Sequence, residues 1–180
     1  MRAARRRLAQ VRQRIRRLSW MARDPDNLHP DVPLLSLPAF LRALARFQTI
    51  RMEREQACVI VLRLQPCDLA LRRAAAMYLL ENTRNCDTLG CTGSDTFLLL
   101  LKGADKNGAR AATQRLHAGL RQLAALQGQL LHVHITVLPV HQHLHPRDIL
   151  PLLSSTGNAV PVKTPPMQDI PMPAANIVRL

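Results

Sequence analysis

The sequence predicts an α/β (more narrowly α+β) domain built on one mixed β-sheet with a βαββαβ core, flanked by helices. Three observations lead to this class. Short apolar segments rich in β-branched residues alternate with longer segments of helical period. Turn residues separate these segments, and this alternation favours a sheet covered by helices over a helical bundle. The length of 180 residues suffices for one such core with extended ends.

Two predicted helices precede the sheet. Residues 5–22 form a basic helix with one apolar stripe, whose members recur at helical spacing: Leu8, Val11, Ile15 and Leu18. A second helix is predicted from Leu37 or Pro38 to about Arg54, because proline suits a first helical turn. Its apolar face comprises Phe40, Leu41, Leu44 and Phe47.

Four predicted strands then alternate with two helices. In chain order these are strand 57–64, helix 68–82, strand 88–91, strand 96–102, helix 107–126 and strand 131–137. The first strand is apolar almost throughout, as interior strands are, whereas the last alternates and has one exposed face. Asp68 is the expected N-cap of its helix. The helix 107–126 is expected to bury Ala111, Leu116, Leu120 and Leu123.

The composition divides the chain into three parts: a basic amphipathic helix at 1–22, a domain at 23–153 and a tail at 154–180. The tail holds five prolines between positions 161 and 173, and we expect it to be disordered or draped over the surface. No apolar run approaches the ~18 residues needed to span a bilayer, so no transmembrane segment is predicted.

The positive charge is concentrated at the start of the chain. The formal net charge is +13, and eight arginines lie between positions 2 and 17. Aromatic residues make up only 3% of the chain, too few for a stacking platform, and nucleic acid is not the expected partner of the domain. The preferred role of the basic helix is contact with a protein partner or self-association. An anionic membrane surface, nucleic acid, or plain solvation of the helix remain alternatives.

Two sets of potential metal ligands lack metal-site spacing. The cysteines form no C-x-x-C pair and read as reduced thiols of a cytosolic protein: Cys58, Cys67, Cys86 and Cys91. The histidines of the C-terminal half alternate in two short groups: His132 and His134, then His141, His143 and His145. No carboxylate or cysteine accompanies them at a useful spacing, so surface histidines are preferred and no metal is expected.

The segment 83–97, TRNCDTLGCTGSDTF, carries the most specific pattern. Arg84 and Asp87 form an R-x-x-D motif, and five residues separate it from Gly93-Ser94-Asp95-Thr96-Phe97. This arrangement resembles the GGDEF domain family, the diguanylate cyclases and their inactive relatives. The apolar strand and LKGAD turn that follow resemble the family as well, and LSLPAF at 35–40 is similar to an eroded form of its N-terminal motif.

Departures from the family pattern imply that catalysis is lost. By resemblance, Arg63 stands where the family has the aspartate that binds Mg²⁺, and a cation cannot ligate a cation. Asp95 is retained, but Thr96 replaces the signature glutamate and cannot act as a carboxylate base. The guanine-reading loop is absent, because Gln65 is followed almost directly by the helix at Asp68. We therefore expect no enzyme activity and no cofactor.

The resemblance also implies a ligand. In the family the R-x-x-D motif binds cyclic di-GMP, so Arg84 and Asp87 would bind it here, joined by Arg115 from the next helix with Arg110 as the second choice. An arginine fork suits phosphate or the guanine acceptors, and a carboxylate accepts from guanine N–H groups. The alternative is that Arg84 and Asp87 form only a salt bridge within the turn.

The sequence thus predicts a non-catalytic cyclic di-GMP receptor domain of the bacterial cytoplasm that signals to a protein partner. By resemblance, related receptors imply a role in biofilm or exopolysaccharide control. Two locations stay open: free in the cytoplasm, or attached to the inner membrane through a protein partner. A ligand-independent scaffold for protein assembly is the alternative, and a regulator that contacts DNA through its basic arm is a third hypothesis.

Overall fold

The structure is a computed structural model that describes residues 27–50, 55–93, 95–141 and 144–154. The predicted helix at 5–22 lies outside these residues, as does the predicted tail apart from Ser154. The described helices include none that is long and apolar enough to cross a bilayer.

The elements follow the predicted order and confirm the fold class. They are α2 (Leu37–Ile50), β1 (Ala57–Gln65), α3 (Leu69–Asn82), β2 (Thr88–Thr92), β3 (Thr96–Lys102), α4 (Lys106–Leu126), β4 (His132–Pro139) and α5 (Pro146–Ser154). Asp68 caps α3 as expected, since its carboxylate accepts a 2.7 Å hydrogen bond from the backbone N–H of Leu71. Helix α5, the last helix within the described residues, was not predicted.

The sheet is antiparallel, and the expectation of a mixed sheet was wrong. Its strand order is β2-β3-β1-β4, and each neighbouring pair is antiparallel. The reason lies in the two βαβ crossovers. The connection through α3 joins the parallel strands β1 and β2 but skips over β3, and the connection through α4 joins β3 and β4 but skips over β1. Parallel strands therefore never become neighbours.

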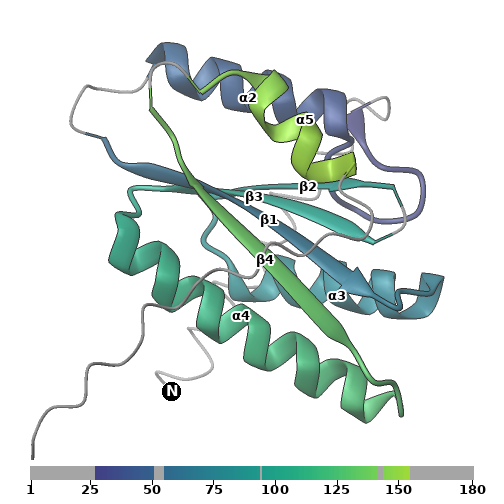
Figure 1. Cartoon of the computed structure of the whole chain (residues 1–180). Helices are drawn as coiled ribbons and strands as arrows, with labels where there is room; N and C mark the ends of the chain where they lie inside the picture. The colour runs from purple at the N-terminus through teal and green to yellow at the C-terminus, as the bar shows by residue number, and fades with distance from the viewer. Residues whose placement is uncertain (1–26, 51–54, 94, 142–143, 155–180) are drawn as a thin grey trace, which may run out of the picture.

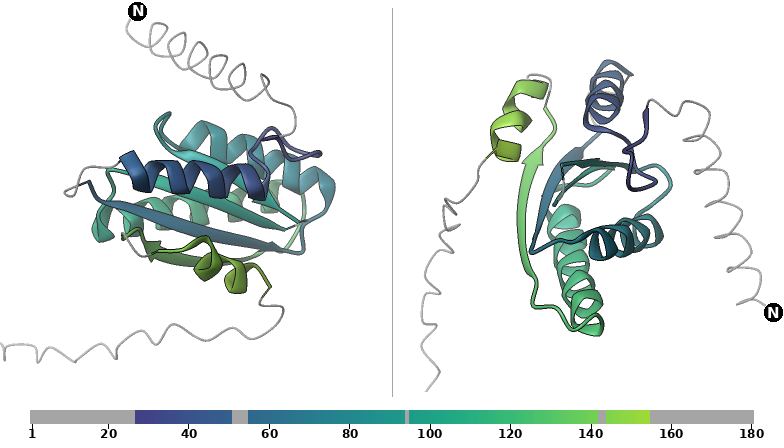
Figure 2. Two further views of the ribbon diagram at one scale, coloured as in Figure 1. Left: turned by 90° about the horizontal axis from the view of Figure 1, so that it is seen from above. Right: turned by 90° about the vertical axis from the view of Figure 1, so that its right-hand side faces the viewer.

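Helices cover both faces of the sheet (Figures 1 and 2). Helices α3 and α4 pack on one face, and α2 and α5 pack on the other. The central strand β1 supplies both cores by simple alternation: Ile60 and Leu62 point toward α3 and α4, while Val59 and Val61 point toward α2 and α5. This alternation explains why β1 reads as a continuous apolar run.

The buried face of α4 differs from the predicted one. Its buried residues are Ala109, Leu116, Leu120 and Ala124. Ala111 is exposed and Leu123 is only half-buried. Large apolar side chains define most of the predicted face, but the structure buries Ala109 and Ala124 in place of Ala111 and Leu123.

The segment before α2 pairs with the edge of the sheet formed by β2. Leu35 forms a parallel bridge with Gly90 of β2, through hydrogen bonds between Leu35 N and Leu89 O (3.2 Å) and between Cys91 N and Leu35 O (2.8 Å). Position 90 is a glycine because a Cβ there would lie 3.0 Å from the side chain of Phe40. An ion pair between Asp31 and Arg72 joins the same segment to α3.

Candidate functional site

The R-x-x-D motif forms the turn between α3 and β2, and Asp87 organises this turn. Its side chain is buried, with 6% of the residue exposed. One carboxylate oxygen accepts from the backbone N–H of Arg84 (2.8 Å), and the other accepts from the backbone N–H of Lys102 in β3 (3.3 Å). The N–H of Asp87 in turn donates to the carbonyl of Arg84 (3.1 Å). Asp87 therefore fixes the turn and ties it to the sheet, while Arg84 is exposed.

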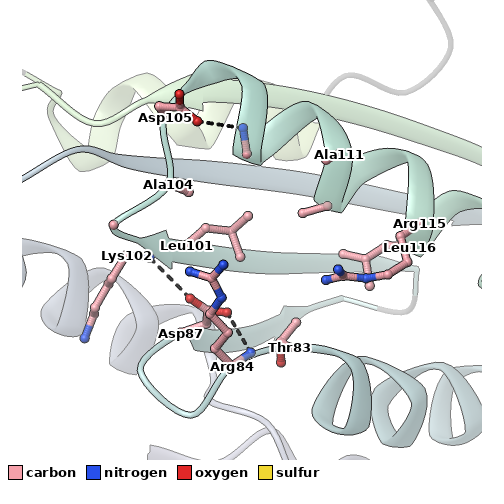
Figure 3. Close-up of a pocket in the computed structure, with 13 residues that line it drawn as sticks. Thr83, Arg84, Asp87, Leu101, Lys102, Ala104, Asp105, Ala111, Arg115 and Leu116 are labelled. Atoms are coloured by element: carbon pink, nitrogen blue, oxygen red, sulfur yellow. Dashed lines mark hydrogen bonds between the residues drawn. The ribbon is translucent and has the colours of Figure 1, made fainter.

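A cavity of about 330 Å³ brings the three predicted ligand-binding residues together. Arg84 and Asp87 line it from the turn, and Arg115 lines it from α4 (Figure 3). The side chains of Arg84 and Arg115 both extend toward the space beside the end of β3. Arg115 is held by a 3.2 Å hydrogen bond from its guanidinium to the carbonyl oxygen of Asn82, the last residue of α3.

Other residues of this cavity were not identified from the sequence. They include Thr83 at the end of α3, Lys102 at the end of β3, and the turn of Gly103, Ala104 and Asp105 that leads into α4. The LKGAD segment carried the only signal, because its glycine and aspartate mark a turn with a helix cap. Gly103 has a φ of 65°, and Asp105 caps α4 by accepting from the N–H of Gly108 (2.7 Å).

Arg110, the second choice for a ligand-binding arginine, lies elsewhere. It lines a different cavity on the other side of α4, together with residues of β1 and β4. Among the two arginines proposed from this helix, the structure therefore brings only Arg115 beside Arg84.

The chemistry of the cavity suits a planar or phosphorylated anion. Two guanidinium groups present forked donors that match a phosphate or the acceptor edge of guanine. The carboxylate of Asp87 accepts from the Cys86 thiol (3.9 Å) as well as from the two backbone N–H groups. Its burial makes Asp87 a positioning residue first and Arg84 the accessible group.

The signature segment forms the β2–β3 hairpin. Gly93 occupies the turn with a φ of 60°, and Ser94 lies outside the described residues. Phe97 is fully buried between the sheet and the α3–α4 layer. Thr96 is buried too, and its hydroxyl donates a 2.8 Å hydrogen bond to the carboxylate of Asp95.

Arg63 of β1 contacts this hairpin. It lies opposite Thr96 in the β1–β3 register and on the α5 side of the sheet, two positions after Val61. Its guanidinium donates to the carbonyl oxygens of Leu152 (3.2 Å) and Leu153 (2.7 Å) in α5, and its Nε lies 3.4 Å from the Thr96 hydroxyl. The same Nε is 3.9 Å from the Asp95 carboxylate. A cation thus occupies the end of β1 beside Asp95.

The connection from β1 to α3 is short, as the sequence indicated. Residues 66–68 link the end of β1 at Gln65 to the start of α3 at Leu69. Gln65 donates a 3.3 Å hydrogen bond to Asp95, so the end of this strand also contacts the hairpin.

The described residues contain no group of three or more His, Cys, Asp or Glu side chains placed to hold a metal ion. His132 and His134 are exposed on β4, His141 and His145 are exposed after it, and His143 lies outside the described residues. All four cysteines are free thiols. Burial raises the pKa of Cys67 to about 11 and that of Cys91 to about 12, so both are protonated at neutral pH.

Comparisons with known proteins identify the fold. No protein-family model matches the sequence, and a search of curated proteins finds no significant match. Among solved structures, the diguanylate cyclase SiaD from Pseudomonas aeruginosa, in complex with its activator SiaC, superposes with a TM-score of 0.64 at 16% identity over 83% of this chain. This chain spans 64% of the SiaD chain.

Two further structures cover 69% of this chain. The FimX GGDEF domain from Pseudomonas aeruginosa has a TM-score of 0.54, 20% identity and 87% of its own length covered. The GGDEF domain of DgcB from Caulobacter crescentus, in complex with c-di-GMP, has a TM-score of 0.55, 9% identity and 84% covered. With the strand order and the hairpin described above, these likenesses show that the chain has the fold of a GGDEF domain.

Proposed function

We propose that this chain is a non-catalytic receptor domain that binds cyclic di-GMP through Arg84, Asp87 and Arg115 and transmits its occupancy to a protein partner. The observation that supports the proposal is that all three residues line one cavity. Arg84 and Asp87 come from the turn before β2, and Arg115 comes from α4, a separate part of the chain. We place this role in the bacterial cytoplasm, in biofilm or exopolysaccharide control.

The size and openness of the site support partial enclosure of the ligand. A volume of about 330 Å³ is at the low end for small-molecule sites, which hold roughly 300–1,000 Å³. A guanine base with its adjoining phosphate suits this space, and the rest of the dinucleotide would extend over the exposed arginines. The DgcB domain, bound to c-di-GMP, provides a precedent for the ligand on this fold, and SiaD with its activator provides one for a protein partner.

The proposed loss of catalysis rests on Arg63. A diguanylate cyclase site of the kind that the sequence resembles needs oxygen ligands for divalent cations beside an anionic triphosphate. Here the guanidinium of Arg63 lies 3.9 Å from Asp95, and carbonyl groups of α5 accept its hydrogen bonds. Asp95 alone would have to hold the cation next to this positive charge. We therefore propose that the β2–β3 hairpin has a structural role in this chain and does not catalyse a reaction.

Isothermal titration calorimetry of the full chain with cyclic di-GMP tests the receptor proposal. We expect binding by the unaltered protein at tens of micromolar protein or below, and loss of about tenfold or more in affinity for Arg84→Ala or Arg115→Ala, since each removes a charge-assisted hydrogen-bond donor. Arg121→Ala is the matched control, because it removes an exposed arginine of α4 that does not line the cavity.

Two results would contradict this proposal. Absence of heat with folded protein, or equal affinities of Arg84→Ala and the unaltered chain, would favour the ligand-independent scaffold. Conversion of GTP to cyclic di-GMP by the pure protein would overturn the argument from Arg63. A partner captured equally well with and without the dinucleotide would show that occupancy is not transmitted.

A further inference from the structure

A second and larger cavity lies on the other side of α4. Its volume is about 1110 Å³, and it is bordered by the start of β1, the second half of β4 and the first two turns of α4. Its apolar wall includes Ala57, Ile135, Val137 and Val140. Val137 is 39% exposed although it is a large apolar side chain, so this wall is open to solvent. The cyclic di-GMP proposal makes no use of this cavity.

The cavity has cations on one side. Lys106 and Arg110 are four positions apart in α4, so they project from the same side of the helix. Both residues are exposed, and neither side chain makes a hydrogen bond or an ion pair with another residue that the structure describes. The two remaining charged groups of the cavity are acidic. Asp105 is engaged as the N-cap of α4, and Glu55 lies two residues before Ala57, the first residue of β1, whose carbonyl oxygen accepts from the N–H of Val140.

We propose that this cavity binds a small anionic amphiphile, a single acyl chain that carries a carboxylate. The acyl chain would lie along the apolar wall formed by β1 and β4, where the side chain of Val137 is exposed. The carboxylate would accept hydrogen bonds from Lys106 and Arg110. An apolar site with a few convergent polar groups is the usual composition of a small-molecule site, and the segregation of apolar wall from cationic helix matches the two ends of an amphiphile.

The position of the charges argues against a neutral or cationic ligand. A neutral ligand would offer the Arg110 guanidinium and the Lys106 ammonium no negatively charged acceptor. A cationic ligand would be repelled by both groups. Glu55 sets the polarity within the cavity, because its carboxylate would repel a bound carboxylate placed at the β1 end. The proposed orientation therefore directs the head group toward α4 and the tail toward Val140 and the end of β4.

Titration of the full chain tests the proposal, with decanoate and decyltrimethylammonium below their micellar concentrations and decanol below its solubility limit. Backbone amide NMR reports the site, and we expect shifts in Ile135, Val137 and Thr113. Decanoate should bind about tenfold more tightly than decanol, since the head group gains charge-assisted hydrogen bonds. The double variant Lys106→Gln with Arg110→Gln should reduce decanoate affinity by about that factor and leave decanol unaffected.

Two variants make the charge argument directional. Glu55→Gln should strengthen decanoate binding by removing a repelling carboxylate, whereas Val137→Asp should weaken it by adding an anion to the apolar wall. Arg121→Gln removes a cation of the same helix outside the cavity and should have no effect. Equal affinities for decanoate and decanol, insensitivity to the double variant, or shifts confined to residues outside the cavity would overturn the proposal. Neither Lys106 nor Arg110 lines the first cavity, so such a failure would leave cyclic di-GMP binding intact.

Discussion

The guanidinium of Arg63 donates a hydrogen bond of 2.7 Å to the carbonyl oxygen of Leu153, the penultimate residue of α5. The last carbonyls of a helix have no partner within the helix, and a cation at that end also complements the helix dipole. Because Nε of the same side chain contacts Thr96, Arg63 joins α5 to the hairpin across the end of the sheet.

Replacing Arg63 with alanine should destabilise the domain. The side chain is 14% exposed, and its loss removes hydrogen bonds to Leu152 and Leu153. We expect the free energy of unfolding to fall by about 2 kcal/mol, as for loss of hydrogen bonds from a charged group. Urea denaturation measures this change, and faster amide exchange confined to α5 would locate it. Arg46→Ala, at an exposed position of α2, is the control; a similar loss there would contradict the assignment.

Asp87 and Arg84 should respond oppositely to mutation. Asp87→Ala leaves two backbone N–H groups without their acceptor in a buried turn, so the free energy of unfolding should decrease by about 1–3 kcal/mol. Arg84→Ala at an exposed position should change it by about 0.5 kcal/mol or less, while cyclic di-GMP binding is lost. Parallel denaturation and calorimetry of both variants check this contrast. Wild-type stability of Asp87→Ala would show that the turn does not need its carboxylate.

Asp68 should make stability depend on pH in the acid range. Hydrogen bonds from the backbone N–H of Leu71 and from Gln129 lower the pKa of Asp68 below its ordinary value of 3.8. A carboxyl whose folded pKa is lowered favours the folded state above its unfolded pKa, and this contribution is lost as the pH falls through the folded pKa.

The test for this prediction uses Asp68→Asn, which keeps a capping oxygen but does not titrate. Urea midpoints measured from pH 6 down to the acid limit of folding should decline less steeply in the variant than in the unaltered chain. Glu55→Gln removes a carboxylate elsewhere and should leave the slope close to that of the unaltered protein. Identical slopes for all three proteins would refute the role of Asp68.

Thiol alkylation should discriminate among the cysteines. Burial raises the pKa of Cys91 to about 12, and its residue is fully buried, whereas Cys86 is exposed. The thiolate is the nucleophile, so iodoacetamide at pH 8 should modify Cys86 at least about tenfold faster than Cys91. Peptide mass spectrometry over a time course gives both rates. Equal alkylation rates of Cys86 and Cys91 in the native protein would contradict the prediction. If both rates were also slower than in urea, they would show that β2 opens readily in the folded protein.

Most elements could be predicted from the sequence because period and capping both pointed to them. The apolar run of β1, the cap at Asp68 and the strand at 96–102 were of this kind. Helix α5 was not predicted, and it contains two prolines, Pro146 and Pro151, a residue type that is unfavourable in a helix interior. Pro146 instead occupies the start of the helix, where proline is tolerated, and Pro151 falls within a helix that the apolar residue Ile149 anchors in the core.

The site was predicted in its members but not in its geometry. The spacing of the motif pointed to Arg84 and Asp87, yet spacing alone carries no information on burial, so the role of Asp87 as an acceptor for backbone N–H groups was not foreseen. The choice between Arg110 and Arg115 required the packing of α4, which places these two arginines at different cavities. Arg63 could be identified from the sequence as a departure from the family pattern. Its hydrogen bonds could not be predicted, because they are made to α5, a helix that the sequence did not indicate.

The bridge between Leu35 and Gly90 makes the two borders of the sheet unequal. At the β2 border, the backbone of residue 35 already occupies hydrogen-bonding groups of residues 89 and 91. At the β4 border, no described strand pairs with the outer side. Edge strands are where proteins aggregate by adding strands from other chains. With one border blocked, β4-to-β4 pairing would join two copies about a twofold axis and then stop, so continued sheet growth into a fibre is disfavoured.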